Sequence, residues 1–251
     1  MKNRVLQFLL ILIILMASCH KENFNSSHRG TGKSGSMARF IIVGDQLYVI
    51  DNASLKVFDI SSANDPEYVK EIGVGTDIET IFSHSNYLYI GSEMGIYIYD
   101  ISDPLSPQYL SKLLHILSCD PVVTNDTLAF VTLFGGGDCR NNNSSISQLD
   151  IIDIKNKENP QLLISHQLDS PLGLALDENY LFLCQGEYGF SVFDFSDIET
   201  LNLIYKNEDH HCYDVITNNK NLLIIGSDGL YQYDYQQIDS IYFISKINIE
   251  R

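Results

Sequence analysis

The feature that most constrains the fold of this chain is a short phrase that recurs five times. Six residues rich in β-favouring side chains, with an aspartate at the fifth position, occur as LKVFDI (55–60), IYIYDI (96–101), LDIIDI (149–154), FSVFDF (190–195) and LYQYDY (230–235). Successive aspartates are 41, 53, 41 and 40 residues apart. A period near forty residues with strand-like segments predicts a β-propeller or a related repeat array.

Each repeat contains four short strand candidates separated by turn residues. In the second repeat they are ETIFSHS, YLYIGS, GIYIYDIS and QYLSKLL, which fall between residues 79 and 114. Four antiparallel strands of this length form one twisted blade. Helical periodicity is almost absent, so we expect an all-β fold. One blade has two apolar faces and needs neighbours, so the copies should stack face to face around an axis.

The repeats predict a β-propeller of five four-stranded blades over residues 37–251. The blades should span about 37–75, 76–117, 118–169, 170–210 and 211–251. The first begins with an inner strand at 40–43 and the last ends with an outer strand at 242–247, so no strand remains to clasp the ring. Five blades would turn by about 72° each. Closure should then rest on face packing between the first and last blades, unless a terminal segment changes position.

The repeated phrase also resembles a known family. The order hydrophobic, Val or Ile, Asp, Ile, Ser, Asp, Pro is similar to the LVIVD repeat, which occurs in predicted bacterial β-propellers and lipoproteins. The second repeat fits this order fully and the first and third nearly so, whereas the fourth and fifth lack the proline, which leaves their turn geometry open. The resemblance covers roughly residues 37–251 and implies a propeller without a settled activity. The absence of tryptophan argues against a WD-type propeller.

The first nineteen residues predict export. Two basic residues precede an apolar run at 5–16, which is typical of a secretory signal and short for a transmembrane helix. The sequence MASC that ends at Cys19 resembles a bacterial lipobox, although Met is less usual than Leu at its first position. This implies a signal peptide at 1–18 and acylation of Cys19; the alternative is an ordinary signal with an incidental cysteine. Residues 19–36 are polar and rich in Gly and Ser, which predicts a flexible tether.

The charge of the chain limits its partners. The formal net charge is -16 at pH 7, and removal of residues 1–18 leaves 14 basic and 32 acidic residues, or -18. Nucleic acids bind through a cationic footprint, which this chain lacks. The lipid anchor predicts a bacterial envelope protein at the outer membrane, facing the periplasm or the cell surface. No sequence motif indicates a cofactor or a metal ion, so neither is predicted.

The topology of a four-stranded blade predicts on which face of the propeller each cysteine lies. Loops joining the fourth strand to the next first strand, and the second strand to the third, share one face, which we call the top; the remaining turns lie on the bottom. Cys119 and Cys139 both fall on the top, so we predict a disulfide between them, worth roughly 3 kcal/mol in an exported protein. Cys184 and Cys212 lie toward the top of neighbouring repeats and are expected to be buried or free thiols rather than a bond.

The top mouth of the channel collects charged residues where the inner strands begin. Corresponding positions hold Arg39, Glu79, Asp120, Leu172 and Tyr213, followed by Asp214. The three carboxylates resemble the set in five-bladed glycosidases, which use an acid, a base or nucleophile and a third orienting carboxylate. Alternatively, they pair with Arg39, bind loop amides or hold water in a polar tunnel. His210, His211 and Cys212 lack zinc-motif spacing, so no metal site is predicted.

The sequence favours a non-enzymatic role. We predict a lipid-anchored propeller that binds a protein or a glycan through its top face, with candidate contacts at Arg39, Glu79, Asp120, Tyr213 and Asp214. No residue is assigned a catalytic role. Two alternatives stay open: a glycoside-active enzyme that uses the three carboxylates, and a structural subunit of an envelope complex. Fold alone does not decide among them.

Overall fold

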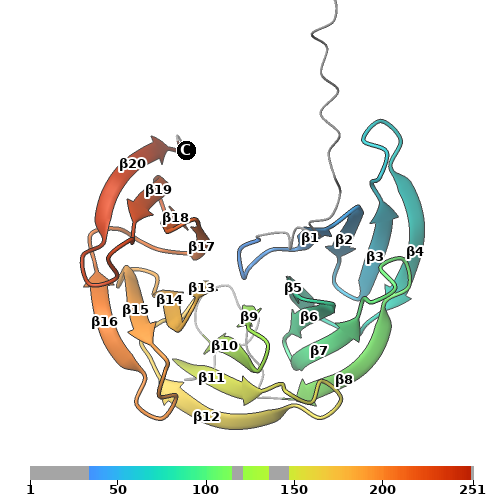
Figure 1. The fold of residues 1–251 in the computed structure, drawn as a ribbon, viewed down its shortest axis with the longest axis horizontal. Coiled ribbons are helices and arrows are strands. Elements are labelled where there is room, and N and C mark those ends of the chain that lie inside the picture. The colour runs from blue at the N-terminus through green and yellow to red at the C-terminus, as the bar shows by residue number, and fades with distance from the viewer. Residues whose placement is uncertain (1–33, 115–120, 136–146, 250–251) are drawn as a thin grey trace, which may run out of the picture. The chain divides into compact units, whose positions relative to one another are not determined.

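The chain forms a propeller built only from β-strands in its described part. The computed structural model describes residues 34–114, 121–135 and 147–249, and residues 31–251 form one compact unit. Twenty strands make five four-stranded antiparallel sheets, one per repeat (Figure 1). The predicted all-β class and the five blades of four strands are therefore confirmed. In the described ranges no helix is long and apolar enough to cross a membrane.

The strands follow the repeats in order, and each blade is a simple meander. Blade 1 consists of β1 (Phe40–Val43), β2 (Gln46–Ile50), β3 (Ser54–Asp59) and β4 (Glu67–Gly73). Blade 2 consists of β5 (Ile78–His84), β6 (Tyr87–Ser92), β7 (Gly95–Asp100) and β8 (Gln108–Leu114). Blade 3 consists of β9 (Val122–Thr124), β10 (Leu128–Phe134), β11 (Ser147–Asp153) and β12 (Gln161–Gln167). Blade 4 consists of β13 (Leu174–Asp177), β14 (Tyr180–Cys184), β15 (Phe190–Asp194) and β16 (Asn202–Asn207). Blade 5 consists of β17 (Asp214–Asn218), β18 (Asn221–Ile225), β19 (Gly229–Asp234) and β20 (Tyr242–Asn248).

The repeated aspartate closes the turn after the third strand of every blade. Its carboxylate accepts a hydrogen bond from the backbone N–H two residues later, at 2.6–2.8 Å, in Asp59, Asp100, Asp153, Asp194 and Asp234. This is the short local bond that aspartate makes in turns. Every blade also has one register shift between its third and fourth strands. The fourth and fifth repeats, which lack the proline, keep the same turn bond and the same irregularity.

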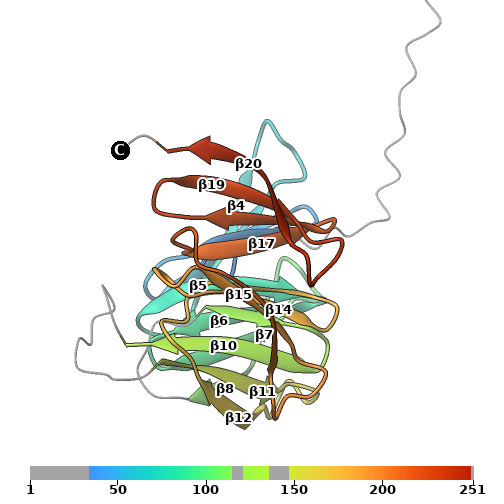
Figure 2. The same ribbon diagram turned by 90° about the vertical axis from the view of Figure 1, so that its left-hand side faces the viewer.

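Each blade packs against the next through a layer of buried side chains. Four hydrophobic clusters join blades 1 and 2, 2 and 3, 3 and 4, and 4 and 5. Alternate residues of a strand serve opposite sides, because side chains alternate along a strand. On β14, Leu181 and Leu183 face blade 3, whereas Phe182 and Cys184 face blade 5, and all four are fully buried. The side view in Figure 2 shows these sheets stacked on one another.

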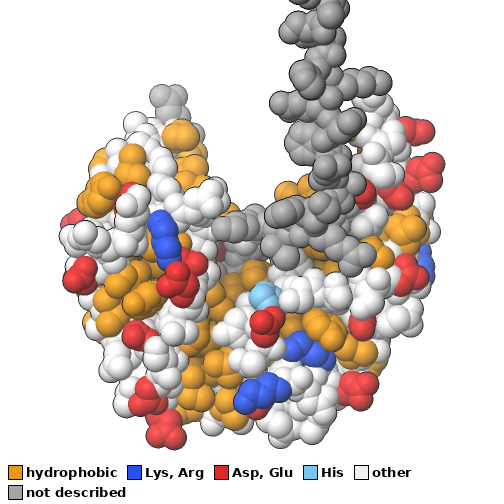
Figure 3. Space-filling view, in the orientation of Figure 1, with side chains coloured by type: hydrophobic (Ala, Val, Ile, Leu, Met, Phe, Trp, Pro, Cys, Tyr) orange, Lys and Arg blue, Asp and Glu red, His pale blue; other side chains and the backbone are white. Residues whose placement is uncertain are grey.

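Blades 1 and 5 each keep one face without a packed neighbour among the described residues. Ile225 on β18 is 41% exposed, whereas Cys184, at the same position of β14, is 0% exposed. Phe40 on β1 is 58% exposed, whereas the equivalent Ile81 on β5 is 0% exposed. The ring is open between these blades (Figure 1 and Figure 3). Face packing between blades 1 and 5, one of the two expected ways of closure, is therefore not found among the described residues, where only the other four interfaces are packed.

A short N-terminal segment links the two ends of the ring instead. Ser36 donates a hydrogen bond from its Oγ to Asp214 Oδ1 at 3.0 Å and accepts one from the Leu174 N–H at 2.8 Å. The backbone N–H of Met37 donates to the other Asp214 oxygen at 3.3 Å. The segment that leads into β1 of blade 1 therefore contacts blades 4 and 5 across the channel.

Candidate functional site

The structure places the predicted top-mouth residues in different surroundings. Arg39 is exposed, and its Nη2 donates to Asn52 Oδ1 at 3.2 Å. Tyr213 packs against His211, with ring centroids 4.4 Å apart. Glu79 lies on β5, and Asp120 lies outside the described residues. Of the three predicted carboxylates, Glu79 and Asp214 lie in the described residues, on β5 and β17.

Asp214 is enclosed by the chain itself. It accepts hydrogen bonds from the Ser36 hydroxyl and from the backbone N–H groups of Met37 and Val215, the last at 3.0 Å. Two glycines allow this approach, since a Cβ at Gly35 or Gly173 would lie 2.1 Å from an Asp214 carboxylate oxygen. Burial raises the pKa of the Asp214 carboxyl, and the hydrogen bonds oppose that rise. This carboxylate therefore anchors the N-terminal segment.

The top loops of blades 4 and 5 are joined covalently. Cys184 at the end of β14 and Cys212 just before β17 form a disulfide with a Cα–Cα distance of 5.0 Å, which is usual for such a bond. Two backbone hydrogen bonds between Gly186 and Cys212, at 3.0 and 3.1 Å, hold the same loops together. The expectation that these cysteines stay unbonded is wrong, because the loops of adjacent blades meet at the top. The predicted Cys119–Cys139 pair and Cys19 lie outside the described residues.

Aromatic side chains come from the same two top loops as this disulfide. The ring of His210 stacks on Tyr231 with centroids 4.2 Å apart, and His211 packs against Tyr213. Tyr188, in the loop between β14 and β15, is 41% exposed. We call Tyr188, His210, His211 and Tyr213 the aromatic platform. The histidines are not part of a metal site with Cys212, whose sulfur is bonded to Cys184, and no group of three or more potential ligands gathers elsewhere in the described ranges.

Next to the platform, Lys246 supports Tyr231. Its Nζ lies 2.6 Å from Asp228 Oδ2 and 4.9 Å from the centre of the Tyr231 ring. The Tyr231 hydroxyl donates to the other Asp228 oxygen. The hydrogen bond from Lys246 keeps the pKa of the Asp228 carboxyl below its ordinary value. These contacts hold the ring on which His210 stacks.

A cavity of about 340 Å³ lies at the bottom end of the channel, away from the predicted mouth. It is lined by residues near the ends of the inner strands β5, β9, β13 and β17 and by Ser34. Apolar side chains form much of its wall, namely Phe82, Val123, Leu174, Ala175, Leu176 and Ile216. The polar residues Ser83, His84, Thr124, Asn125, Asp177, Glu178 and Thr217 complete it.

Two residues that line the cavity, Ser83 and Thr124, carry hydroxyl oxygens that are themselves buried and have no accessible surface in it. Ser83 Oγ and Thr124 Oγ1 have no hydrogen-bond partner of normal geometry among the described residues, and both residues are only 4% exposed. Thr124 lies beside the hydroxyl of Tyr89, which is also buried without a partner of normal geometry. Burial raises the pKa of the Tyr89 hydroxyl. The Thr124 and Tyr89 hydroxyls therefore face each other in the interface between blades 2 and 3 and not the cavity.

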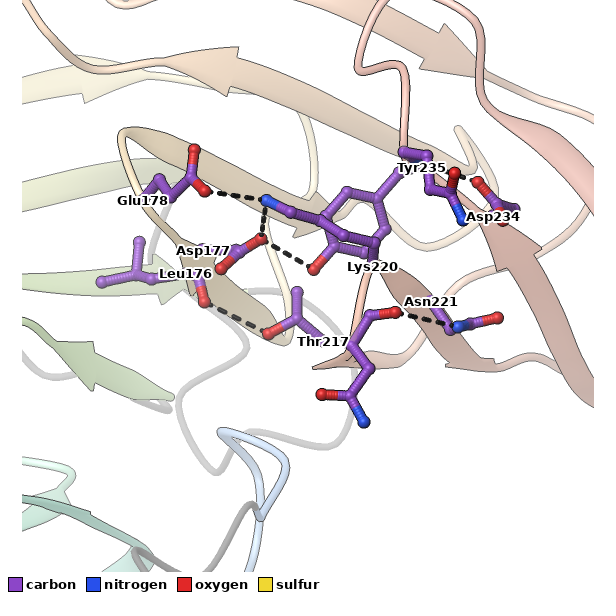
Figure 4. Close-up of polar contacts among 10 residues, drawn as sticks. Leu176, Asp177, Glu178, Thr217, Lys220, Asn221, Asp234 and Tyr235 are labelled. Atoms are coloured by element: carbon purple, nitrogen blue, oxygen red, sulfur yellow. Dashed lines mark hydrogen bonds and ion pairs between the residues drawn. The ribbon is translucent and has the colours of Figure 1, made fainter.

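Charged groups at the rim of the cavity are paired across blades. Lys220 of blade 5 lies 2.7 Å from Asp177 Oδ2 and 3.0 Å from Glu178 Oε1 of blade 4, and Figure 4 shows its Nζ between the two carboxylates. The Tyr235 hydroxyl donates to the same Asp177 oxygen at 3.0 Å (Figure 4). The hydrogen bond to Asp177 raises the pKa of Lys220. On the blade 2 side of the rim, His84 Nε2 lies 2.8 Å from Asp126 Oδ1.

Sequence reasoning missed this cavity because it considered only the top face. The cavity residues come from the ends of four inner strands and have no shared motif. The cavity residues of each blade share only their position: they lie in the first strand, before its turn to the second strand, or in that turn. That turn lies on the bottom by the same topological rule that placed the cysteines.

Five four-stranded antiparallel blades around a channel define the chain as a β-propeller. Within it, residues 81–113 match the LVIVD repeat, which runs here from within β5 to within β8. The resemblance stated for the second repeat is thereby confirmed. No curated protein matches the chain.

Solved structures with the same fold come from proteins of different kinds. A functionally unknown protein from Desulfotomaculum acetoxidans matches with a TM-score of 0.68 at 8% identity, over 84% of this chain and 69% of its own. The periplasmic gluconolactonase PpgL of Pseudomonas aeruginosa matches with a TM-score of 0.63 at 12% identity, over 82% and 68%. BamB from Moraxella catarrhalis matches with a TM-score of 0.51 at 15% identity, over 83% and 60%. This chain spans only part of the length of these proteins, and the likeness shows the fold alone.

Proposed function

We propose that the chain is a binding module that holds a protein or a glycan on the aromatic platform of its top face. The observation that carries the proposal is the disulfide between Cys184 and Cys212, which fixes the two loops that present the platform. A surface held in its bound shape before binding loses less conformational entropy when the ligand arrives. Loops on a rigid scaffold are the usual place for such a surface.

The chemistry of the platform suits both ligand types. Tyrosine and histidine rings offer an apolar face together with polar edges, so they pack on sugar rings or apolar side chains while forming hydrogen bonds. Tyr188 is exposed, and His210 is held by its stack on Tyr231. Arg39, with its guanidinium at the same end of the channel, adds a charged contact.

The contacts of Asp214 favour binding over glycoside hydrolysis. A hydrolase of the carboxylate type needs two carboxyl groups that face the scissile bond. Asp214 instead receives three hydrogen bonds from Ser36, Met37 and Val215 and lies beneath the N-terminal segment. The fold likeness to a gluconolactonase does not change this, because fold alone does not carry function.

The proposal includes a location at the bacterial envelope. Lipid on Cys19 and a tether that runs from there to Ser34, where the chain joins the propeller, would hold the propeller at the outer membrane. Mass spectrometry of the protein purified from cells should find Cys19 acylated and as the first residue. Cys19→Ser should release the protein from the membrane fraction. A mature protein that begins elsewhere, or that carries an unmodified Cys19, would contradict the anchor.

The binding proposal is tested with purified protein on a glycan array and by chemical cross-linking in cells. Tyr188→Ala and Tyr213→Ala should abolish the signal found for the wild type. Tyr109→Ala is the matched control, since Tyr109 on β8 is 57% exposed and belongs to the outer strand of blade 2. Binding that survives both platform substitutions would overturn the assignment. Glycoside turnover that Asp214→Asn abolishes would favour the enzyme instead.

A further inference from the structure

We propose that the bottom cavity of the channel binds a small organic cation, an alkylammonium ion with one positive charge and a compact apolar body. This site lies at the opposite end of the channel from the aromatic platform and is independent of the proposed function. Its volume of about 340 Å³ is at the lower end of small-molecule pockets, which range from about 300 to 1,000 Å³. A cavity of that size suits one small molecule.

The apolar part of the cavity wall favours a ligand that carries carbon groups. This part is supplied by three blades, through Phe82, Leu174, Ala175, Leu176 and Ile216. Carbon groups that pack on such a wall are stabilised in proportion to the apolar area removed from water. A bare metal ion gains nothing from this packing, and the described ranges contain no group of three or more potential metal ligands.

On the blade 4 side of the rim, carboxylates outnumber the cations bonded to them. Asp177 and Glu178 both line the cavity and share one lysine, Lys220, whose Nζ lies 2.7 and 3.0 Å from them. Lys220 and the Tyr235 hydroxyl both contact Oδ2 of Asp177, and Lys220 contacts Oε1 of Glu178. These bonds therefore use one oxygen of each carboxylate. Because two carboxylates face one ammonium group, a net negative charge remains beside the cavity.

The rest of the bottom face has the same sign. On the blade 2 and 3 side of the rim, Asp126 is bonded by His84, which carries a charge only when it is protonated, and its backbone carbonyl accepts a hydrogen bond from Lys157. At least one exposed acidic residue also lies in the turn between the third and fourth strands of every blade, namely Asp65, Asp103, Glu158, Asp197 and Asp239. The basic residues of the described bottom turns are Lys155, Lys157 and Lys220. A surface with such an excess of one charge attracts the opposite charge from solution.

The apolar wall and the negative rim together select the class of ligand. A cation with an apolar body packs its carbon groups on the wall and places its charge beside Asp177 and Glu178. A neutral apolar molecule would remove water from these carboxylates without replacing its hydrogen bonds. An anion would be repelled by them. Lys220 already shares the two carboxylates, so it competes with the cation for them.

The test is calorimetric titration of the full chain with choline and butylammonium. Their neutral analogues, 3,3-dimethyl-1-butanol and 1-pentanol, have nearly the same shape without the charge, and butyrate supplies the opposite charge. We expect at least one cation to bind. Its neutral analogue should bind about tenfold more weakly, because it lacks the attraction to the carboxylates, and butyrate should not bind. Added salt should weaken the binding of the cation, since the rim is open to solvent.

Three substitutions locate the bound cation. Glu178→Gln should weaken binding about threefold, and the fold should tolerate it because this side chain is 67% exposed. Lys220→Met should tighten binding by a similar factor, because it removes the competing ammonium group. Asp51→Asn is the control and should leave Kd unchanged. Asp51 also pairs with a lysine, Lys56 at 2.8 Å, but it lies in the loop between β2 and β3 at the top.

A second readout does not depend on any variant. Wild-type crystals soaked in the cation that binds best should show its ammonium group beside Asp177 and Glu178 and its carbon groups against Leu174 or Ile216. The proposal is overturned if no cation binds at about 10 mM (roughly the weak limit of specific binding) or if the neutral analogue binds as tightly. It is also overturned if Lys220→Met does not tighten the binding, or if the bound cation lies elsewhere.

Discussion

The disulfide between Cys184 and Cys212 joins blades 4 and 5 across 28 residues of chain. In the chain-entropy description, a cross-link stabilises the fold because it restricts the unfolded chain, and a loop of this length gives about 3.5 kcal/mol at 25 °C. Both cysteines are fully buried in the blade 4–5 cluster, so replacing them by alanine also leaves a small cavity. We therefore expect the double variant Cys184→Ala/Cys212→Ala to lose about 3.5–5 kcal/mol.

The loss should be measured by chemical denaturation and by calorimetry, where it corresponds to roughly 7–20 °C in melting temperature for a domain of this size. Either single variant should lose nearly as much as the double variant, because one missing sulfur already opens the loop. Hydrogen exchange should rise first at Gly186 and Tyr213, whose backbone bonds lie beside the cross-link. A double variant within about 1 kcal/mol of the wild type would refute the reasoning, as would two free thiols found by mass spectrometry of unreduced protein.

Three further predictions concern Asp214, the open faces and the cavity rim. Burial raises the folded-state pKa of the Asp214 carboxyl above its ordinary 3.8. The free energy of unfolding of the wild type should therefore fall as the pH rises from about 4 through that raised pKa. In urea melts, Asp214→Asn should remove this part of the pH dependence. Ile224→Ala should lower the free energy of unfolding by about 2–4 kcal/mol, because Ile224 is only 2% exposed. Ile225→Ala should lower it by under about 1 kcal/mol, because Ile225 is 41% exposed. Equal losses would show that blade 5 is covered on both faces in solution. Lys220→Met should lower the free energy of unfolding by at most about 1 kcal/mol, because the ion pair with Asp177 is partly exposed. The loss should be smaller in 1 M salt, which screens the pair. A loss that does not depend on salt would indicate lost packing instead.

The repeat unit was predictable from the sequence because its determinants are local. The aspartate of each repeat bonds a backbone N–H only two residues away, so its role does not depend on the rest of the fold. The same is true of the strands, whose apolar residues alternate within one short segment. Blades 4 and 5 retain this geometry without the proline, because the carboxylate of Asp194 or Asp234 alone fixes the start of the turn.

The closure of the ring was not predictable in the same way. It depends on the angle between neighbouring blades, which is set by the sizes of side chains packed between them and not by the number of repeats. The pairing of Cys184 with Cys212 likewise depends on how two loops from adjacent blades meet. Sequence placed both cysteines toward the top, and that placement was correct, but their mutual distance is a property of the packed interface.

In the candidate site, too, the sequence predicted at which end of the channel a residue lies, but not which residues it contacts. The topological rule placed Asp214 at the top mouth, but the bond from Ser36, 178 residues away in sequence, gives it a structural role. The bottom cavity had no motif, because its wall is built from single residues of different blades that come together only in the folded ring. Cys19, Asp120 and the Cys119–Cys139 pair lie outside the described residues and stay predictions.

The two uncapped sheets at the ends of the array have a consequence for how such a molecule behaves at high concentration. Phe40 and Ile42 on blade 1 and Ile225 and Ile247 on blade 5 are all more than 40% exposed. The two surfaces differ from each other, so contact between them on separate molecules would be head to tail, and contacts of that kind propagate into fibres unless the rotation closes. Solubility then rests on repulsion among acidic monomers, and it should fall as salt weakens that repulsion or as the pH approaches the isoelectric point of about 4.6.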